Sequence, residues 1–192
     1  MTYRWTLLRA GAFRLDGGCM FGVVPKALWA RLSPPDEENR IPLQTNCLLL
    51  EGGGRRVLVE TGYGSKWGEK DRAIFGMEQR SVLDALAEVG VAPGDIDAVV
   101  VTHLHFDHAG GLTRLDDDGR PVTCFPRAEV IVQRQEWEDA LANRSTMTRT
   151  YLRSHLDPVA AQVRLVEGDL EVLPGIRVTP PRILEVVAVA GR

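Results

Sequence analysis

The chain has 192 residues, of which 44% are hydrophobic and 26% are charged, a composition typical of a single soluble globular domain. Its formal net charge is −3, and Arg55–Arg56 is the only adjacent pair of basic residues, so neither nucleic acid nor an anionic membrane surface is an expected partner. No apolar run approaches the roughly 20 residues that cross a bilayer.

The cysteines and the N-terminal region favour a cytoplasmic location. Cys19, Cys47 and Cys124 are widely spaced and odd in number, which fits neither a disulfide framework nor a CxxC zinc site, so reduced thiols are expected. Residues 1–18 carry charges throughout and lack a long apolar stretch, so they predict no secretion signal.

The first third of the chain reads as β-rich. Residues 3–18 predict a strand, a turn and a second short segment that ends at glycines. Residues 32–44 are polar and contain prolines, which predicts a loop overhanging a site. Apolar runs at 47–50 and 57–59 flank Gly52-Gly53-Gly54, a pattern that predicts a β-hairpin.

Strands and helices alternate in the rest of the chain. Apolar residues at helical spacing predict a helix over residues 78–89, closed by Gly90. The apolar run 98–101 is typical of a buried strand. Residues 130–132 predict a strand that leads into a helix, and residues 163–178 predict three strands separated by turns.

The stretch THLHFDHAGG, residues 102–111, holds three of the four histidines of the chain. In an extended segment His103 and His105 point to the same side; Asp107 continues this parity, and His108 lies beside it where the chain turns into glycines. Two imidazoles can bind one metal ion, and an adjacent carboxylate and imidazole can bind a second. These donors suit Zn²⁺, with iron and manganese as alternatives, so the sequence predicts a metal site.

Other candidate residues carry weaker signals. His155 stands alone on a predicted helix and is expected to be an ordinary surface histidine. Residues 60–62, Glu-Thr-Gly, follow a predicted strand. They either contact the metal ligands without binding the metal themselves or form a structural turn, and the sequence leaves both alternatives open. Cys124 is expected to pack or to lie free rather than to bind metal.

The motif T-H-x-H-x-D-H-x-G-G resembles the metal motif of the metallo-β-lactamase superfamily. The resemblance extends over about residues 3–179 and is greatest to the branch that includes quorum-quenching N-acyl-homoserine lactonases. It implies an α/β fold, the αβ/βα sandwich, and a pair of zinc ions (Zn2+). By position, His103 and His105 would bind the first ion, and Asp107 and His108 the second.

The resemblance also implies a reaction. A hydroxide between the metals would attack the carbonyl of a small-molecule lactone, ester or thioester, and Asp107 would act as the catalytic residue that passes a proton to the leaving oxygen. A glyoxalase-II-like thioesterase is the second interpretation. A ribonuclease-like activity is third, because the acidic charge disfavours it. The oligomeric state is left open.

The chain departs from the family pattern near its end. Family members supply three further ligands after this motif: a histidine in a GHxxGH-like turn, a bridging aspartate and a late histidine. No histidine follows His155, and Glu185 is the only acid beyond Pro174. We therefore expect a single domain over residues 1–192, truncated in its C-terminal half, with residues 180–192 as a tail outside the family pattern. We also expect impaired activity, with a non-catalytic metal-binding fragment as the alternative.

Overall fold

The computed structural model describes residues 2–144 and 150–180, so the predicted tail beyond Pro180 lies outside the described residues. The strands are β1 Arg4–Asp16, β2 Arg40–Gly52, β3 Arg55–Val59, β4 Ala98–Val100, β5 Thr113–Leu115, β6 Pro121–Thr123, β7 Glu129–Gln133, β8 Val163–Val166, β9 Leu170–Leu173 and β10 Ile176–Val178. The α-helices are α1 Gly17–Phe21, α2 Lys26–Trp29, α3 Glu69–Ile74, α4 Val82–Glu88, α5 Phe106–Ala109, α6 Arg134–Leu141 and α7 Arg153–Leu156. Short 3₁₀ turns lie at Pro93–Asp95, Gly110–Leu112 and Asp157–Gln162.

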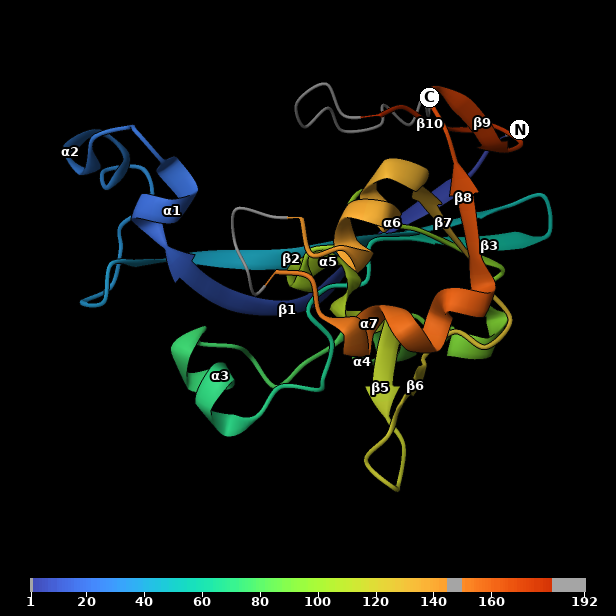
Figure 1. Ribbon diagram of the computed structural model, residues 1–192, viewed down its shortest axis with the longest axis horizontal. Coiled ribbons are helices and arrows are strands. Elements are labelled where there is room, and N and C mark those ends of the chain that lie inside the picture. Colours follow the sequence, from blue (N-terminus) through green and yellow to red (C-terminus); the bar gives the residue numbers. More distant parts are fainter. Residues whose placement is uncertain (1, 145–149, 181–192) are drawn as a thin grey trace.

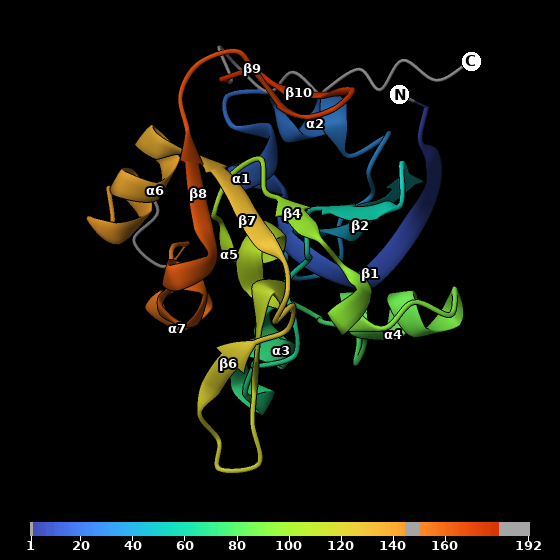
Figure 2. The ribbon, with the colours of Figure 1, turned by 90° about the vertical axis from the view of Figure 1, so that its right-hand side faces the viewer.

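One mixed sheet organises the molecule, with strand order β1-β2-β3-β4-β7-β8 (Figure 2). The β1, β2 and β3 strands pair antiparallel, whereas β3, β4, β7 and β8 run parallel. The parallel strands are joined by segments that contain helices, as is usual in α/β proteins. The predicted α/β class is confirmed.

Alternate residues of the central strands divide the core between the two faces of the sheet. Leu58, Val99 and Val130 belong to one buried cluster, which also holds apolar side chains of α4, α6 and α7. Their neighbours Val57, Val100 and Ile131 face the other side, where residues of β8, β9 and β10 pack on them, including Val166, Val172, Leu173, Ile176 and Val178. The short apolar strand β4 is therefore buried on both faces, as its sequence predicts.

The first strand differs from the prediction. Residues 3–18 were expected to form a strand, a turn and a second short segment, but β1 is continuous and pairs with β2 along its length (Figure 1). The register shifts between Arg9 and Ala12, and Gly11 has φ of 130° at this irregularity, so this part of the chain has a bulge and the strand continues. A Cβ at Gly11 would overlap the hydroxyl of Tyr63, which explains the glycine.

The long β1–β2 hairpin also changes the predicted loop at residues 32–44. Its last five residues belong to β2, because Ile41 is buried and pairs with Leu15 across the hairpin. The helices α1 and α2 lie at the far end of the hairpin, away from the rest of the molecule (Figure 1). No helix in the described part of the chain is long and apolar enough to cross a membrane.

The remaining strand and helix predictions are close to the structure. The β2–β3 hairpin turns at Gly53 and Gly54, both with positive φ. The helix predicted over residues 78–89 is shorter, since Ser81 and Asp84 form a capping box that starts α4 at Val82. The β7–α6 unit and the three strands β8, β9 and β10 lie where the sequence predicts them.

Candidate metal centre

The histidine motif lies at the carboxyl end of β4, in the middle of the parallel part of the sheet. An irregular segment leads from Val101 to α5, whose residues include Asp107 and His108. The β3 and β7 strands pair with β4 on its two sides and run in the same direction. Their carboxyl ends therefore meet the motif at the same edge of the sheet, where ligands usually bind in open α/β sheets.

The four predicted ligands lie together. The ring centroids of His103 and His105 are 4.6 Å apart, and those of His103 and His108 are 3.8 Å apart. Asp107 Oδ2 is 3.5 Å from His108 Nε2. The structure brings the whole predicted donor set into one cluster, while metal ligation by these residues remains a prediction.

The four side chains carry donor types that bind zinc, and one pair of their donor atoms lies at the separation found in a tetrahedral zinc site. In a tetrahedral zinc site, bonds of about 2.0–2.1 Å place neighbouring donor atoms roughly 3.4 Å apart. The separation of Asp107 Oδ2 and His108 Nε2, 3.5 Å, matches this value. In residues 2–144 and 150–180, however, no three His, Cys, Asp or Glu side chains are arranged to hold one ion. The pair therefore fits an ion, and a full shell needs further donors or a rearrangement of these rings.

Two of the imidazoles are held neutral, the form that binds metal. Burial, together with the charges of His108 and His105, lowers the pKa of His103 to about 3. Burial also lowers the pKa of His105. The hydroxyl Oγ1 of Thr102 lies 3.0 Å from Nδ1 of His103, which leaves Nε2 of that ring available to an ion.

His108 is in a different electrostatic environment, because Glu60 contacts its ring. Burial by itself lowers the pKa of His108, but the hydrogen bond and charge of Glu60 and the charge of Asp107 outweigh it and raise the pKa. Nδ1 of His108 donates to Glu60 Oε2 over 2.8 Å, which leaves Nε2 facing Asp107. A carboxylate behind a metal-binding histidine orients the ring and fixes its tautomer.

The Glu60-Thr61-Gly62 segment therefore both supports the cluster and makes a turn. Glu60 has φ of 64°, and its Oε1 also accepts a hydrogen bond from the backbone N–H of Thr102 over 2.8 Å. The hydroxyl of Thr61 donates to the carbonyl of His108 over 2.7 Å. The carbonyl of Gly62 accepts from the N–H of Gly111 over 3.0 Å. All three residues hold the motif against the end of β3.

Lys66 supports the glycine turn that follows the motif, and the sequence analysis did not identify it. Its Nζ donates to the carbonyls of Gly110 and Thr113, each over 2.6 Å. Burial lowers the pKa of Lys66 to about 8. A single lysine in an irregular segment carries no local signal of such a role, because both acceptors lie more than 40 residues away in the chain.

The prediction of a surface position for His155 is wrong. The residue lies on α7 as expected, but it is only 2% exposed, and its ring meets Trp67 edge-on with 6.0 Å between centroids. Burial lowers the pKa of His155 to about 3. Its helix packs against the turn after the motif rather than lying on the surface, a tertiary contact that the local sequence does not reveal. Cys124 is buried in the core and unpaired, in agreement with the prediction.

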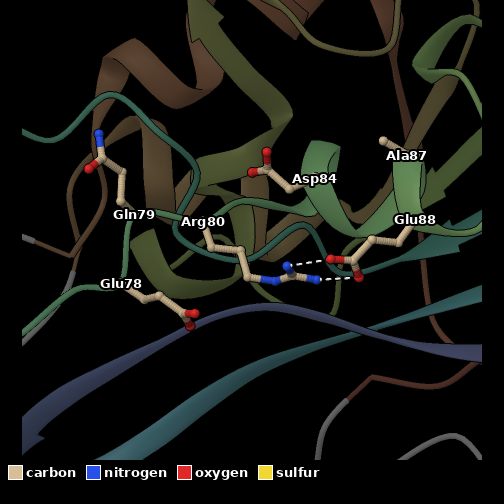
Figure 3. Close-up of a pocket in the computed structure, with 6 residues that line it drawn as sticks. All are labelled: Glu78, Gln79, Arg80, Asp84, Ala87 and Glu88. Carbon is tan, nitrogen blue, oxygen red and sulfur yellow. Dashed lines mark hydrogen bonds and ion pairs between the residues drawn. The ribbon is translucent and has the colours of Figure 1, made fainter.

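A surface hollow of about 540 Å³ lies along α4 and the segment before it, and none of the motif residues line it (Figure 3). Arg80 extends along this hollow and makes two hydrogen bonds of 2.6 Å to the carboxylate of Glu88. Its Nε donates to the carbonyl of Arg9 over 2.7 Å. Because the guanidinium is already paired, we assign no ligand to this hollow.

Comparison with known proteins relates this geometry to a family. A family model described as the metallo-beta-lactamase superfamily matches residues 40–184. The N-acyl homoserine lactonase AiiA of Bacillus thuringiensis subsp. kurstaki is 32% identical over 142 residues, which make up 68% of this chain and 50% of the relative. The chain thus spans about half the length of the curated relatives it matches.

Solved structures agree with this assignment. A probable metal-dependent hydrolase from Staphylococcus aureus has a TM-score of 0.81 and 34% identity, with 91% of this chain and 62% of that chain covered. An N-acyl homoserine lactone hydrolase, solved with N-hexanoyl-L-homoserine at its catalytic metal centre, has a TM-score of 0.65 and 26% identity, with 93% and 66% covered. From the matched motif, the fold and these relatives, we conclude that the chain belongs to the metallo-beta-lactamase superfamily, with lactonases among its relatives.

Proposed function

We propose that the protein is a zinc-dependent hydrolase of carbonyl esters, with lactones as the favoured substrates, acting in the cytoplasm on small molecules. The observation that carries this proposal is the meeting of His103, His105, Asp107 and His108 at the end of β4. The lactone preference is supported by the relatives that are N-acyl homoserine lactonases. Three unpaired thiols are compatible with a reducing compartment.

The proposed ligands divide into two pairs, as the resemblance implies. His103 and His105 would hold one zinc ion, and Asp107 and His108 would hold the second. Zinc bound at such a site lowers the pKa of a bound water toward neutrality and polarises a substrate carbonyl. The neutral rings of His103 and His105 are ready to donate their lone pairs, whereas at His108, whose pKa Glu60 and Asp107 raise, zinc competes more strongly with a proton.

Asp107 has a second proposed role, in proton transfer. Its side chain is one-fifth exposed, so it can face both an ion and a bound substrate. A carboxylate beside the scissile bond can receive a proton and pass it to the leaving alkoxide, which completes the ring opening of a lactone. Asp107 is therefore the proposed catalytic residue.

A polypeptide of these 192 residues should hold zinc weakly. The four clustered side chains offer two donors to each ion, while a tightly held zinc has about four ligands. Misplacement of a reacting group by about 1 Å already costs on the order of a hundredfold in rate. We therefore propose that this polypeptide binds fewer than two zinc ions and hydrolyses lactones slowly.

The test compares substrates and variants with zinc added. Opening of N-hexanoyl homoserine lactone is followed by release of protons, and hydrolysis of S-lactoylglutathione is measured alongside it. Asp107→Asn is compared with Asp118→Asn, a matched control in the exposed turn between β5 and β6. Slow lactone opening that a chelator stops and Asp107→Asn abolishes supports the proposal.

Other outcomes select the alternatives. Faster hydrolysis of the thioester than of the lactone supports the glyoxalase-II-like interpretation. Zinc binding without hydrolysis of either substrate supports the non-catalytic metal-binding fragment. Lactone opening that continues in Asp107→Asn contradicts the assigned role of this carboxylate.

A further inference from the structure

The histidine loop is the irregular segment of residues 102–105 between Val101 and α5, together with the first turn of α5. Its backbone lacks regular pairing between Val101 and α5, so the N–H groups there depend on other acceptors. Two of these acceptors are glutamate side chains. Glu60 Oε1 accepts from the N–H of Thr102 over 2.8 Å, and Glu136 Oε1 accepts from the N–H of Leu104 over 2.7 Å. The two amides belong to the residues directly before His103 and His105. Each carboxylate therefore holds the backbone at one histidine.

The topology of the sheet explains why the carboxylates reach the loop from opposite sides. The β3 and β7 strands flank β4 and run parallel to it. Glu60 is the first residue after β3, and Glu136 is the third residue of α6, which begins directly after β7. The carboxyl ends of parallel strands meet at one edge, so the elements after both neighbours of β4 lie beside the loop.

The imidazole of His105 also packs against an aromatic side chain. The ring of Tyr151 meets that of His105 edge-on, with 5.3 Å between centroids and 60° between planes. Glu136 therefore holds the backbone directly before a histidine whose ring packs against Tyr151.

We propose that Glu136 is a positioning residue that forms, with Glu60, a two-sided carboxylate clamp on the histidine loop and fixes the orientation of His105. The proposal rests on the proposed function only in treating His105 as a zinc ligand. Groups that orient metal ligands typically contribute 10–100-fold to metal affinity. Glu60 acts directly on a ring nitrogen of His108, whereas Glu136 acts on His105 through the backbone.

The experiment compares four variants of the full chain with the wild-type protein. Glu136→Ala removes the acceptor, and Glu136→Gln keeps a neutral carbonyl acceptor for the Leu104 amide. Glu138→Ala and Glu138→Gln, two residues further along α6 and exposed, are the matched controls. In the metal-free proteins, NMR measures hydrogen exchange at the Leu104 amide and at the amides of α6. Zinc affinity is then measured by competition with a chromophoric chelator.

We expect the largest effect in Glu136→Ala, a smaller effect in Glu136→Gln and none in the Glu138 variants. In Glu136→Ala the Leu104 amide exchanges at least tenfold faster while the α6 amides keep their protection, and zinc affinity falls 10–100-fold. Glu136→Gln shows a smaller change in both quantities, and the Glu138 variants match the wild type. Equal exchange at the Leu104 amide in Glu136→Ala and Glu138→Ala would overturn the clamp.

The two readouts separate this proposal from the proposed function. If the wild-type chain binds no zinc, the proposed function fails, and exchange at the Leu104 amide still decides whether Glu136 holds the loop. If zinc binds and the Glu136 variants lose Leu104 protection without losing affinity, the positioning of His105 by Glu136 is refuted. Faster exchange throughout α6 shows that the substitution unfolds the helix, and this result also counts against a specific clamp.

Discussion

Replacement of His155 by phenylalanine should remove a pH dependence from the stability of the protein. The ordinary pKa of histidine, about 6.5, applies to the unfolded chain, and burial lowers the pKa in the folded protein to about 3. Between these values the unfolded state binds one more proton, so the contribution of His155 is complete above pH 6.5 and is lost as the pH falls. The loss is about 1.4 kcal/mol per pH unit, or about 2 kcal/mol between pH 6.5 and pH 5.

The assay is urea unfolding at pH 7.5 and pH 5.0 with a chelator present. His155→Phe keeps a planar ring beside Trp67 and has no group to titrate. Between the two pH values its free energy of unfolding should therefore fall by about 2 kcal/mol less than that of the wild type. Because His103 is also held neutral by burial, the variant should keep part of the pH dependence. Equal losses in both proteins would refute the buried, neutral state of His155.

Two further predictions concern the residues that hold the histidine loop. Glu60→Gln removes the charge that faces His108, so an NMR titration should show a lower pKa for that ring, and a chelator competition should show a zinc affinity about 10–100-fold lower. An unchanged pKa of His108 would contradict the assigned contact. Lys66→Met removes the donor to the carbonyls of Gly110 and Thr113, so the free energy of unfolding measured with urea should fall by about 1–3 kcal/mol. An unchanged free energy of unfolding would contradict the stabilising role of this ammonium group.

The sequence predicted elements best where the local pattern was strong. The apolar runs around Gly53 and Gly54 predicted the β2–β3 hairpin, and the apolar stretch before the motif predicted β4. The turn predicted within residues 3–18 is absent, because β1 continues through a bulge at Gly11 that only pairing with β2 reveals.

The motif itself also identified the four clustered residues, since their donor types and spacing are local properties. Their supports could not be found in the same way. Glu136 accepts a hydrogen bond from a residue 32 positions earlier, and nothing in the sequence around it distinguishes it from Glu138. The burial of His155 likewise depends on how α7 packs. These properties come from the approach of distant segments at the end of the sheet.

Long-range ¹H–¹⁵N NMR of the histidine rings during zinc addition shows whether the histidine motif binds zinc. We predict that the Nε2 signals of His103 and His108 and a ring nitrogen of His105 shift on zinc addition. The buried ring of His155, which packs on Trp67, should not respond. A spectrum in which these three rings stay unchanged at saturating zinc, or in which His155 alone responds, would refute zinc binding by this motif.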